Sequence, residues 1–539
     1  MTNSKADNNE EKSKQITSMP EPFGDFYILD PAIPDEKSEI KNLLYKERRG
    51  RIDPGRRIFH LMFPAESDYC NTVILEKNYI DEDYLVSFSR FYFLSHVPIS
   101  KYCQRMHFFS NKLNQENLFN LSDNDKQSYL GFTVLRPTPV NAIGRTVIRP
   151  QNSKPESLYV TCGESYDVSL AGNKLKATGA CFQQQDSQVG ACASNAVFMA
   201  TRHMAKRFGM QYKTTTEISE LASQYDSFLG RGIPSRGLST SQMGKVLNSM
   251  GYDVIIYGEE SRPQSLKDAV YKTIESEIPV IITFDILSGL STGASHAITI
   301  VGHLWKNDGQ VTWLPTVVDI EIAGKMQKVQ YYTTGSIIDK FITMDDARGP
   351  YRTLRFDKST EELIYCEDDR GELQCKLKSV IIPLPRGIWL SGEQAERKAL
   401  TILLAGAAAS GDAITLPKEI VLRTYLRASN QIKDDSLDSP QKVPTGIKLI
   451  IRGTQMPKYV WVTEVSSKEL AEQKLKLGEL IIDPSSSPWA FDFLAFHMQD
   501  RLVFDDGTKS IPIEGWNGPY PMLCRSSLES RHTIQCSQH

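Results

Sequence analysis

Cys192, His296 and Asp345 are the residues of this chain whose types could together perform nucleophilic chemistry on a carbonyl group. A cysteine thiolate attacks a carbonyl carbon, an imidazole transfers the proton, and a carboxylate holds the imidazole in the productive orientation. The three residues are far apart in the sequence. The elements that carry them must therefore bring them together.

Cys192 follows a polar loop at 183–190 and precedes a predicted helix that ends at Gly209. Apolar residues recur on one face of this helix at three- and four-residue steps, namely at Ala193, Val197, Ala200, Met204 and Phe208. Cys192 is thus expected at a helix N-terminus. There the helix dipole and the unpaired N–H groups stabilise a thiolate and can receive a developing oxyanion.

His296 stands at the start of the segment 295–303, which is apolar on both faces and predicts a strand in the middle of a sheet. A helix capped by Ser265 and an apolar strand at 279–284 are expected before it. The pattern therefore predicts that the base lies at the mouth of a central strand.

Two acids, Asp345 and Asp346, end a predicted strand at 341–345 and could accept a hydrogen bond from the imidazole. Asp345 stands at the strand end. Asp346 falls on the opposite face if the strand continues, and it remains the alternative orienting acid.

From about Ala180 to Pro385 the chain resembles the papain-like cysteine peptidase superfamily, especially the compact bacterial peptidases that process bacteriocin leaders. The ordered items are a glutamine-bearing loop, Cys192 opening a helix, Gly251 after a second amphipathic helix, a Pro-Val-Ile strand, His296, and Asp345 before Gly349. The resemblance implies a Cys192–His296–Asp345 triad, a protein or peptide substrate, and neither a metal nor another cofactor.

The chain departs from the family at the residue that donates to the oxyanion. Papain-like enzymes have a glutamine six residues before the nucleophile, whereas this chain has Asp186 there. Gln185 and Gln188 are the candidates for this role, and Gln185 is preferred because a one-residue loop insertion would place it correctly.

The length of 539 residues predicts several domains. We expect an α+β fold: a disordered tail at 1–22, an α+β domain at 23–157, the papain-like domain at 158–385 and a second α+β domain at 386–539. In this last domain a helix is predicted at 392–404 and strands at 447–451 and 459–462. The flanking domains have no catalytic signature, so they are expected to gate the cleft or bind a regulatory protein.

Composition excludes several classes of function. A net charge of -3, from 62 basic and 65 acidic residues, gives no reason to expect nucleic-acid binding. The longest uncharged apolar run, 399–409, is too short to cross a membrane, and no signal segment opens the chain, so a cytoplasmic protein is expected. Nine cysteines without a CxxC pair favour reduced thiols over disulfides or a zinc site.

Other candidate motifs are weaker. Ser291 lies in a GxSxG pattern, but a strand rather than a helix follows it. His303 and His203 are interpreted as structural. A possible cluster of His497, Asp500 and Cys524 has no helix-opening cysteine.

The sequence therefore predicts a cysteine peptidase that hydrolyses a peptide or isopeptide bond. Two alternatives are an acyl transferase or amidase with the same triad, and a catalytically inactive papain-like scaffold. A bacterial intracellular regulator or a toxin-like effector would fit this prediction.

Overall fold

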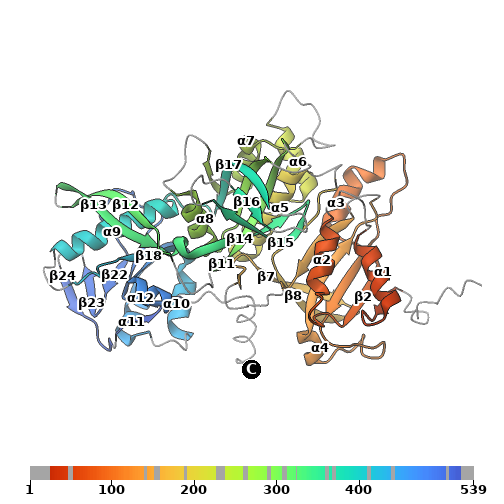
Figure 1. The fold of residues 1–539 in the computed structure, drawn as a ribbon, viewed down its shortest axis with the longest axis horizontal. Coiled ribbons are helices and arrows are strands. Elements are labelled where there is room, and N and C mark those ends of the chain that lie inside the picture. The colour runs from red at the N-terminus through yellow and green to blue at the C-terminus, as the bar shows by residue number, and fades with distance from the viewer. Residues whose placement is uncertain are drawn as a thin grey trace, which may run out of the picture.

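The computed structural model of the chain has three lobes that follow the sequence from one end of the molecule to the other (Figure 1). It describes residues 25–45, 53–138, 142–150, 158–186, 191–225, 237–258, 265–287, 293–305, 312–322, 324–357, 363–366, 372–409, 414–438, 443–504, 509–516 and 518–523. Helices and strands are mixed in each lobe, so the fold is α+β, as the sequence predicts.

The N-terminal lobe is an antiparallel sheet with strands in chain order, covered by helices. The strands are β1 (Phe26–Leu29), β2 (Thr72–Tyr79), β3 (Cys103–Phe109), β4 (Tyr129–Leu135) and β5 (Ile143–Ile148). The helices are α1 (Pro34–Leu44), α2 (Pro54–Met62), α3 (Glu82–Arg90), the 3-10 turn η1 (Tyr92–Leu94) and α4 (Asp123–Gln127). A hairpin of β7 (Glu164–Leu170) and β8 (Asn173–Gly179) packs beside β4 and β5.

The central lobe contains an antiparallel sheet that closes on itself, because β10 pairs with both β11 and β17. The closed strands are β10 (Val280–Ile286), β11 (Ser295–Trp305), β14 (Ile338–Asp345), β15 (Gly349–Phe356), β16 (Leu363–Cys366) and β17 (Leu373–Leu384), with β6 (Leu158–Tyr159) and β9 (Asp253–Tyr257) paired outside. Its helices are α5 (Cys192–Phe208), α6 (Thr215–Ser223), α7 (Thr240–Ser249), α8 (Leu266–Glu275) and the 3-10 turn η3 (Thr334–Ile337).

The C-terminal lobe is a long sheet of strands flanked by helices. Its strands are β12 (Pro315–Ile322), β13 (Lys325–Thr333), β18 (Val421–Ala428), β19 (Tyr459–Ser466), β21 (Gly478–Ile482), β22 (Ala495–Met498), β23 (Arg501–Phe504) and β24 (Lys509–Pro512), with a small pair of β20 (Leu475–Lys476) and β25 (Tyr520–Pro521). Its helices are α9 (Gly392–Ala409), α10 (Ser429–Asp438), α11 (Thr445–Gly453) and α12 (Lys468–Glu472).

The hairpin of β12 and β13 connects two lobes. In the chain it lies between β11 and β14, but β13 pairs in parallel with β18 of the C-terminal lobe. Figure 1 shows this green hairpin reaching across to the blue strands. The next strands in the chain after β11, which carries His296, are therefore part of the C-terminal sheet.

Local predictions hold where caps or apolar periodicity are strong. The helix capped by Ser265, the helix from Gly392 and the strand from Tyr459 are all confirmed. The strand predicted at 447–451 is wrong, because these residues lie in α11. Ile447 and Ile451, four residues apart, are buried in one cluster, so packing of a helix face outweighs the β preference of isoleucine.

None of the described helices is long and apolar enough to cross a membrane.

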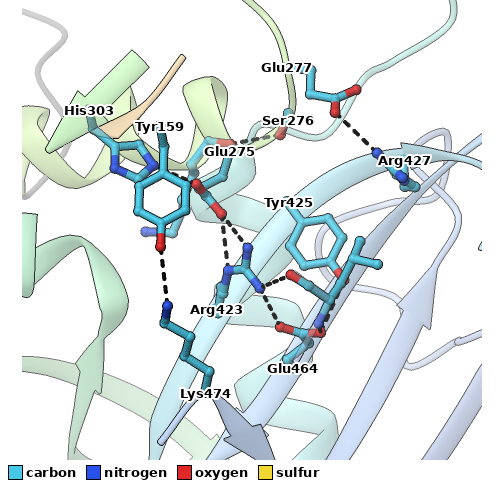
Figure 2. Close-up of polar contacts among 12 residues, drawn as sticks. Tyr159, Glu275, Ser276, Glu277, His303, Arg423, Tyr425, Arg427, Glu464 and Lys474 are labelled. Carbon is cyan, nitrogen blue, oxygen red and sulfur yellow. Dashed lines mark hydrogen bonds and ion pairs between the residues drawn. The ribbon is translucent and has the colours of Figure 1, made fainter. Parts of the chain in front are cut away.

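A network of buried charges joins the central and C-terminal lobes (Figure 2). Arg423 on β18 donates to Glu275 of α8 at 2.6 Å and to Glu464 of β19 at 3.0 Å. Glu275 also contacts His303 Nε2 at 2.7 Å, and Arg427 pairs with a second glutamate at the end of α8. Because each charge has partners of opposite sign, the interface can be polar and still dry.

We expect Arg423→Met to destabilise the protein by about 3–5 kcal/mol, because Glu275 and Glu464 would remain buried without their shared cation. Urea unfolding followed by circular dichroism measures the loss. The matched control is Arg355→Met, whose pair with Glu372 has side chains 40% and 52% exposed and should contribute at most about 1 kcal/mol. Equal midpoints for the two variants would contradict a structural role for the network.

Candidate active site

Cys192 is the first residue of α5, as the sequence predicts. Ala191 before it is extended, and its N–H donates to the Ser194 hydroxyl at 2.9 Å, which fixes the start of the helix. The helix ends at Gly209, whose φ of 66° is left-handed. Helix α5 packs on β11, where the Thr299 hydroxyl donates to the backbone of α5 at 3.0 Å.

The cysteine side chains that the structure describes are all buried except that of Cys192, which is partly exposed. Burial raises the pKa of Cys70, Cys103 and Cys181 to about 12, and that of Cys375 to about 11. A buried neutral thiol is a poor nucleophile. Cys192 is therefore the candidate nucleophile within this set.

His296 is the second residue of β11, and its side chain is 11% exposed. Its Nε2 lies 2.9 Å from Asp345 Oδ1, which leaves Nδ1 to face a second partner. Burial opposes a charge on the imidazole. The Asp345 carboxylate and hydrogen bonds to Asp345 and Cys192 outweigh burial and raise the pKa of His296 well above 6.5. The imidazole thus binds Asp345 directly and lies near the Cys192 thiol.

Asp345 ends β14 and is fully buried. Besides His296, its Oδ1 accepts the backbone N–H groups of Ala347 at 2.8 Å and Arg348 at 3.1 Å, while Oδ2 accepts the Tyr365 hydroxyl at 2.8 Å. Burial favours the neutral acid, but the charge and hydrogen bond of His296, followed by the Arg348 charge, hold the pKa of Asp345 well below its usual range. This carboxylate is fixed and ionised.

Asp346 lies near the same ring but does not bind it. The strand ends at Asp345 and residues 346–348 form a turn, so Asp346 does not take the opposite strand face. Its Oδ1 is 3.7 Å from His296 Nε2 and has no hydrogen-bond partner among the described residues, whereas Oδ2 accepts from Asn195 at 3.4 Å. Burial, with a contribution from the Asp345 charge, raises the pKa of Asp346 to about 7.

The structure describes one of the two glutamines that were predicted to donate to the oxyanion. Gln188 lies outside the described residues, and Gln185 is half-buried in the segment before it. Asp186, which stands where the family has glutamine, is buried, and its Oδ2 accepts the hydroxyl of Tyr92 in the N-terminal lobe at 2.9 Å. Asp186 therefore connects the segment before the nucleophile to the N-terminal lobe.

The N-terminal lobe makes further contacts with this segment and with the residues that follow the turn at 346–348, here called the acid turn. Arg136 donates to the backbone oxygen of Gln184 at 2.8 Å. At Gly349 the φ of 106° and an approach that would place a Cβ 2.7 Å from the Cβ of Arg57 both require glycine. Arg57 in turn donates to the Tyr351 backbone oxygen at 2.8 Å.

Sequence reasoning missed Gln183, Asn195 and Tyr365. Gln183 is buried and donates to Asn195 at 3.4 Å, and Asn195 donates to Asp346. Asn195 had a signal, because it stands three residues after Cys192 and so shares its helix face. Tyr365 had none, because only the closed sheet brings it to Asp345.

His296, Asp345 and Asp346 are also the described residues that could hold a metal ion, with ligand atoms within 4.8 Å of one another. However, the oxygens of Asp345 already accept from His296, two backbone N–H groups and Tyr365. A cation would have to displace these donors. The donor set fits a hydrogen-bonded acid and base better than a metal site.

The other histidines in the central lobe have structural partners. His303 is buried, and its Nε2 contacts Glu275 at 2.7 Å and its ring stacks on Tyr159. His203 is buried too, and its Nε2 lies 2.8 Å from the backbone oxygen of Glu277. Both therefore belong to the packing of the lobe.

The remaining candidate motifs do not form a functional site among the described residues. His497 contacts the Tyr520 hydroxyl at 2.7 Å, and its pKa falls to about 4 chiefly through burial. Cys524, the cysteine of that possible cluster, and Ser291 both lie outside the described residues. His497 is a buried neutral histidine.

No family model matches the chain, and no curated protein matches its sequence. The function is therefore inferred from the geometry of the site.

We expect iodoacetamide at mildly acidic pH to alkylate Cys192 faster than any buried cysteine, because its side chain is partly exposed and lies near the imidazole of His296. His296→Ala should slow this labelling by at least about tenfold, since the base that takes the proton from the thiol is lost. Peptide mapping by mass spectrometry after a brief pulse measures each rate.

The matched control for this prediction is His96→Ala, which removes an exposed histidine elsewhere and should leave the labelling rate unchanged. Labelling of Cys192 that is equally fast without His296 would rule out this role of the imidazole.

Proposed function

We propose that this chain is a cysteine peptidase that hydrolyses a peptide or isopeptide bond in a protein substrate, and that its central lobe is papain-like. The observation that carries the proposal is the 2.9 Å hydrogen bond between His296 and the buried Asp345, with Cys192 close enough to the imidazole to contribute to the rise of its pKa. A nucleophile, a base and an orienting acid in this order can form and break an acyl thioester.

In the first half of the reaction, the Cys192 thiolate attacks the carbonyl carbon of the scissile bond. The N–H groups of the first turn of α5 stabilise the oxyanion, because they have no acceptors within the helix. The imidazolium of His296 then protonates the leaving amine, the C–N bond breaks, and a thioester to Cys192 remains.

In the second half, neutral His296 takes a proton from water, and the hydroxide attacks the thioester carbon. The C–S bond breaks, the carboxylic acid leaves, and the proton returns to the Cys192–His296 pair. Asp345 keeps Nε2 bound throughout, so Nδ1 exchanges the proton with sulfur, amine and water. An acyl transferase would differ only in the nucleophile of this half.

The arrangement of elements supports a papain-like layout. The nucleophile opens a helix, whereas the base and the acid lie on neighbouring antiparallel strands, β11 and β14. Helix α5 packs directly on β11. The thiol therefore faces the imidazole across the boundary between helix and sheet.

Cys192→Ala should abolish cleavage, and His296→Ala should be about as damaging, because the members of such a triad act as a unit. Incubation with a peptide library, followed by mass spectrometry of new termini, detects hydrolysis without a known substrate. Cys181→Ala, which removes a buried thiol, is the control expected to cleave normally. Turnover by Cys192→Ala at the wild-type rate would end the peptidase proposal, and amine-capped products would indicate acyl transfer.

Asp345→Asn should lower kcat/KM by about a hundredfold or more, because the amide no longer fixes the charged, correctly oriented imidazole. Asp346→Asn is an isosteric control: below its pKa of about 7 the native side chain is also neutral, so we expect a change within about threefold in mildly acidic buffer. Rates are compared on a peptide from the digestion. The reverse ranking would transfer the orienting role to Asp346.

A further inference from the structure

Tyr365 is the one side chain of the described residues that reaches the second oxygen of Asp345 with a hydroxyl donor. All other hydrogen bonds to this carboxylate end on Oδ1, and they come from His296 and from the turn after β14. Arg348 approaches Oδ2 only to 3.8 Å. Tyr365 is therefore the donor that holds Oδ2, and rotation of the carboxylate about its Cβ–Cγ bond would break this bond as well as those on Oδ1.

Tyr365 also supports the imidazole from a second direction. Its ring packs at a tilt on Phe284, with centroids 6.3 Å apart, and Phe284 meets His296 edge-on at 5.7 Å. The four side chains come from β14, β16, β10 and β11 of the closed sheet. Tyr365 thus contacts both groups that hold the ring of His296.

The hydroxyl stays a donor at every pH where the protein would work. Tyr365 is 2% exposed, and burial followed by the Asp345 charge raises its pKa well above 10. Thr343 lies 3.4 Å from the same oxygen, and the Arg348 guanidinium stands 5.0 Å from the ring centroid. The other carboxyl group near the imidazole is Asp346.

We infer that Tyr365 is a positioning residue for the base: its hydroxyl fixes the plane of the Asp345 carboxylate and its ring fixes Phe284, so that His296 is aimed at Cys192. The inference depends on the proposed use of these residues in nucleophilic chemistry. It gives a role in the site to strand β16, which carries no residue of the triad.

Tyr365→Phe tests this inference, because it removes one oxygen and keeps the ring. We expect the rate of Cys192 alkylation and kcat to fall about tenfold with KM unchanged, since a hydrogen bond to a charged group is lost. Tyr129→Phe is the matched control. Tyr129 is 1% exposed and its hydroxyl contacts His107 at 2.8 Å in the N-terminal lobe, so neither rate should change.

A double-mutant cycle separates positioning from general support of the fold. If Tyr365 acts through Asp345, Tyr365→Phe in an Asp345→Asn background should cost less than about twofold further. An equal loss in both backgrounds, a wild-type rate for Tyr365→Phe, or a lower urea midpoint than that of Tyr129→Phe would overturn the inference.

The alkylation rate can be measured without a substrate. Failure of the positioning role can therefore be distinguished from failure of the peptidase proposal. A coupled cycle in alkylation without any peptide cleavage would support the positioning role and reject the peptidase proposal. Peptide cleavage that Tyr365→Phe does not affect would leave the peptidase proposal standing and reject Tyr365 as a positioning residue.

Discussion

Closure of the central sheet through the pairing of β10 with both β11 and β17 is the constraint on which the site depends. In an open sheet β10 would be an edge strand, separated from β16 by β11, β14 and β15. Closure instead brings Tyr365, Phe284, His296 and Asp345 together from four strands. The cluster is buried because the strands that supply it are covered on their inner face, so its hydrogen bonds are stronger than they would be in water.

The two flanking lobes bind different segments around the candidate site. The N-terminal lobe binds the segment before Cys192 through Tyr92 and Arg136, and it binds the residues after the acid turn through Arg57. The C-terminal lobe binds α8 through Arg423 and also receives the β12–β13 hairpin that follows β11. Each lobe therefore contacts a segment near an element that carries a residue of the candidate site.

The two acids show how burial divides the roles of neighbouring carboxyl groups. Asp345 and Asp346 are adjacent in sequence and both fully buried, so they compete for one proton near one imidazole. Asp345 has donors on both oxygens and stays ionised, whereas Asp346 has one weak donor and its pKa rises to about 7. The number of donors, rather than distance along the chain, decides which of the two carboxyl groups is ionised beside the imidazole.

Sequence patterns failed where local preference and tertiary packing disagree. The isoleucine-rich segment 447–451 favours a strand by composition, yet it forms a helix because Ile447 and Ile451 bury one face against the C-terminal sheet. The polar segment from Ser429 also forms a helix, α10, which packs beside α11. In the first segment the four-residue spacing of Ile447 and Ile451 fits a helix face, but composition alone favours a strand.

The sequence by itself determined the elements that present the thiol, the imidazole and the acid. Apolar periodicity after Cys192 and the C-cap at Gly209 are local, as are the strands that carry His296 and Asp345. Only the tertiary structure decided that Asp345 rather than Asp346 meets His296, and that Tyr365, Asn195 and Gln183 join them. The physical reason is that helix caps and periodicity depend on neighbours in the chain, whereas a hydrogen bond between strands depends on register and sheet closure. Those are set by packing across the whole lobe.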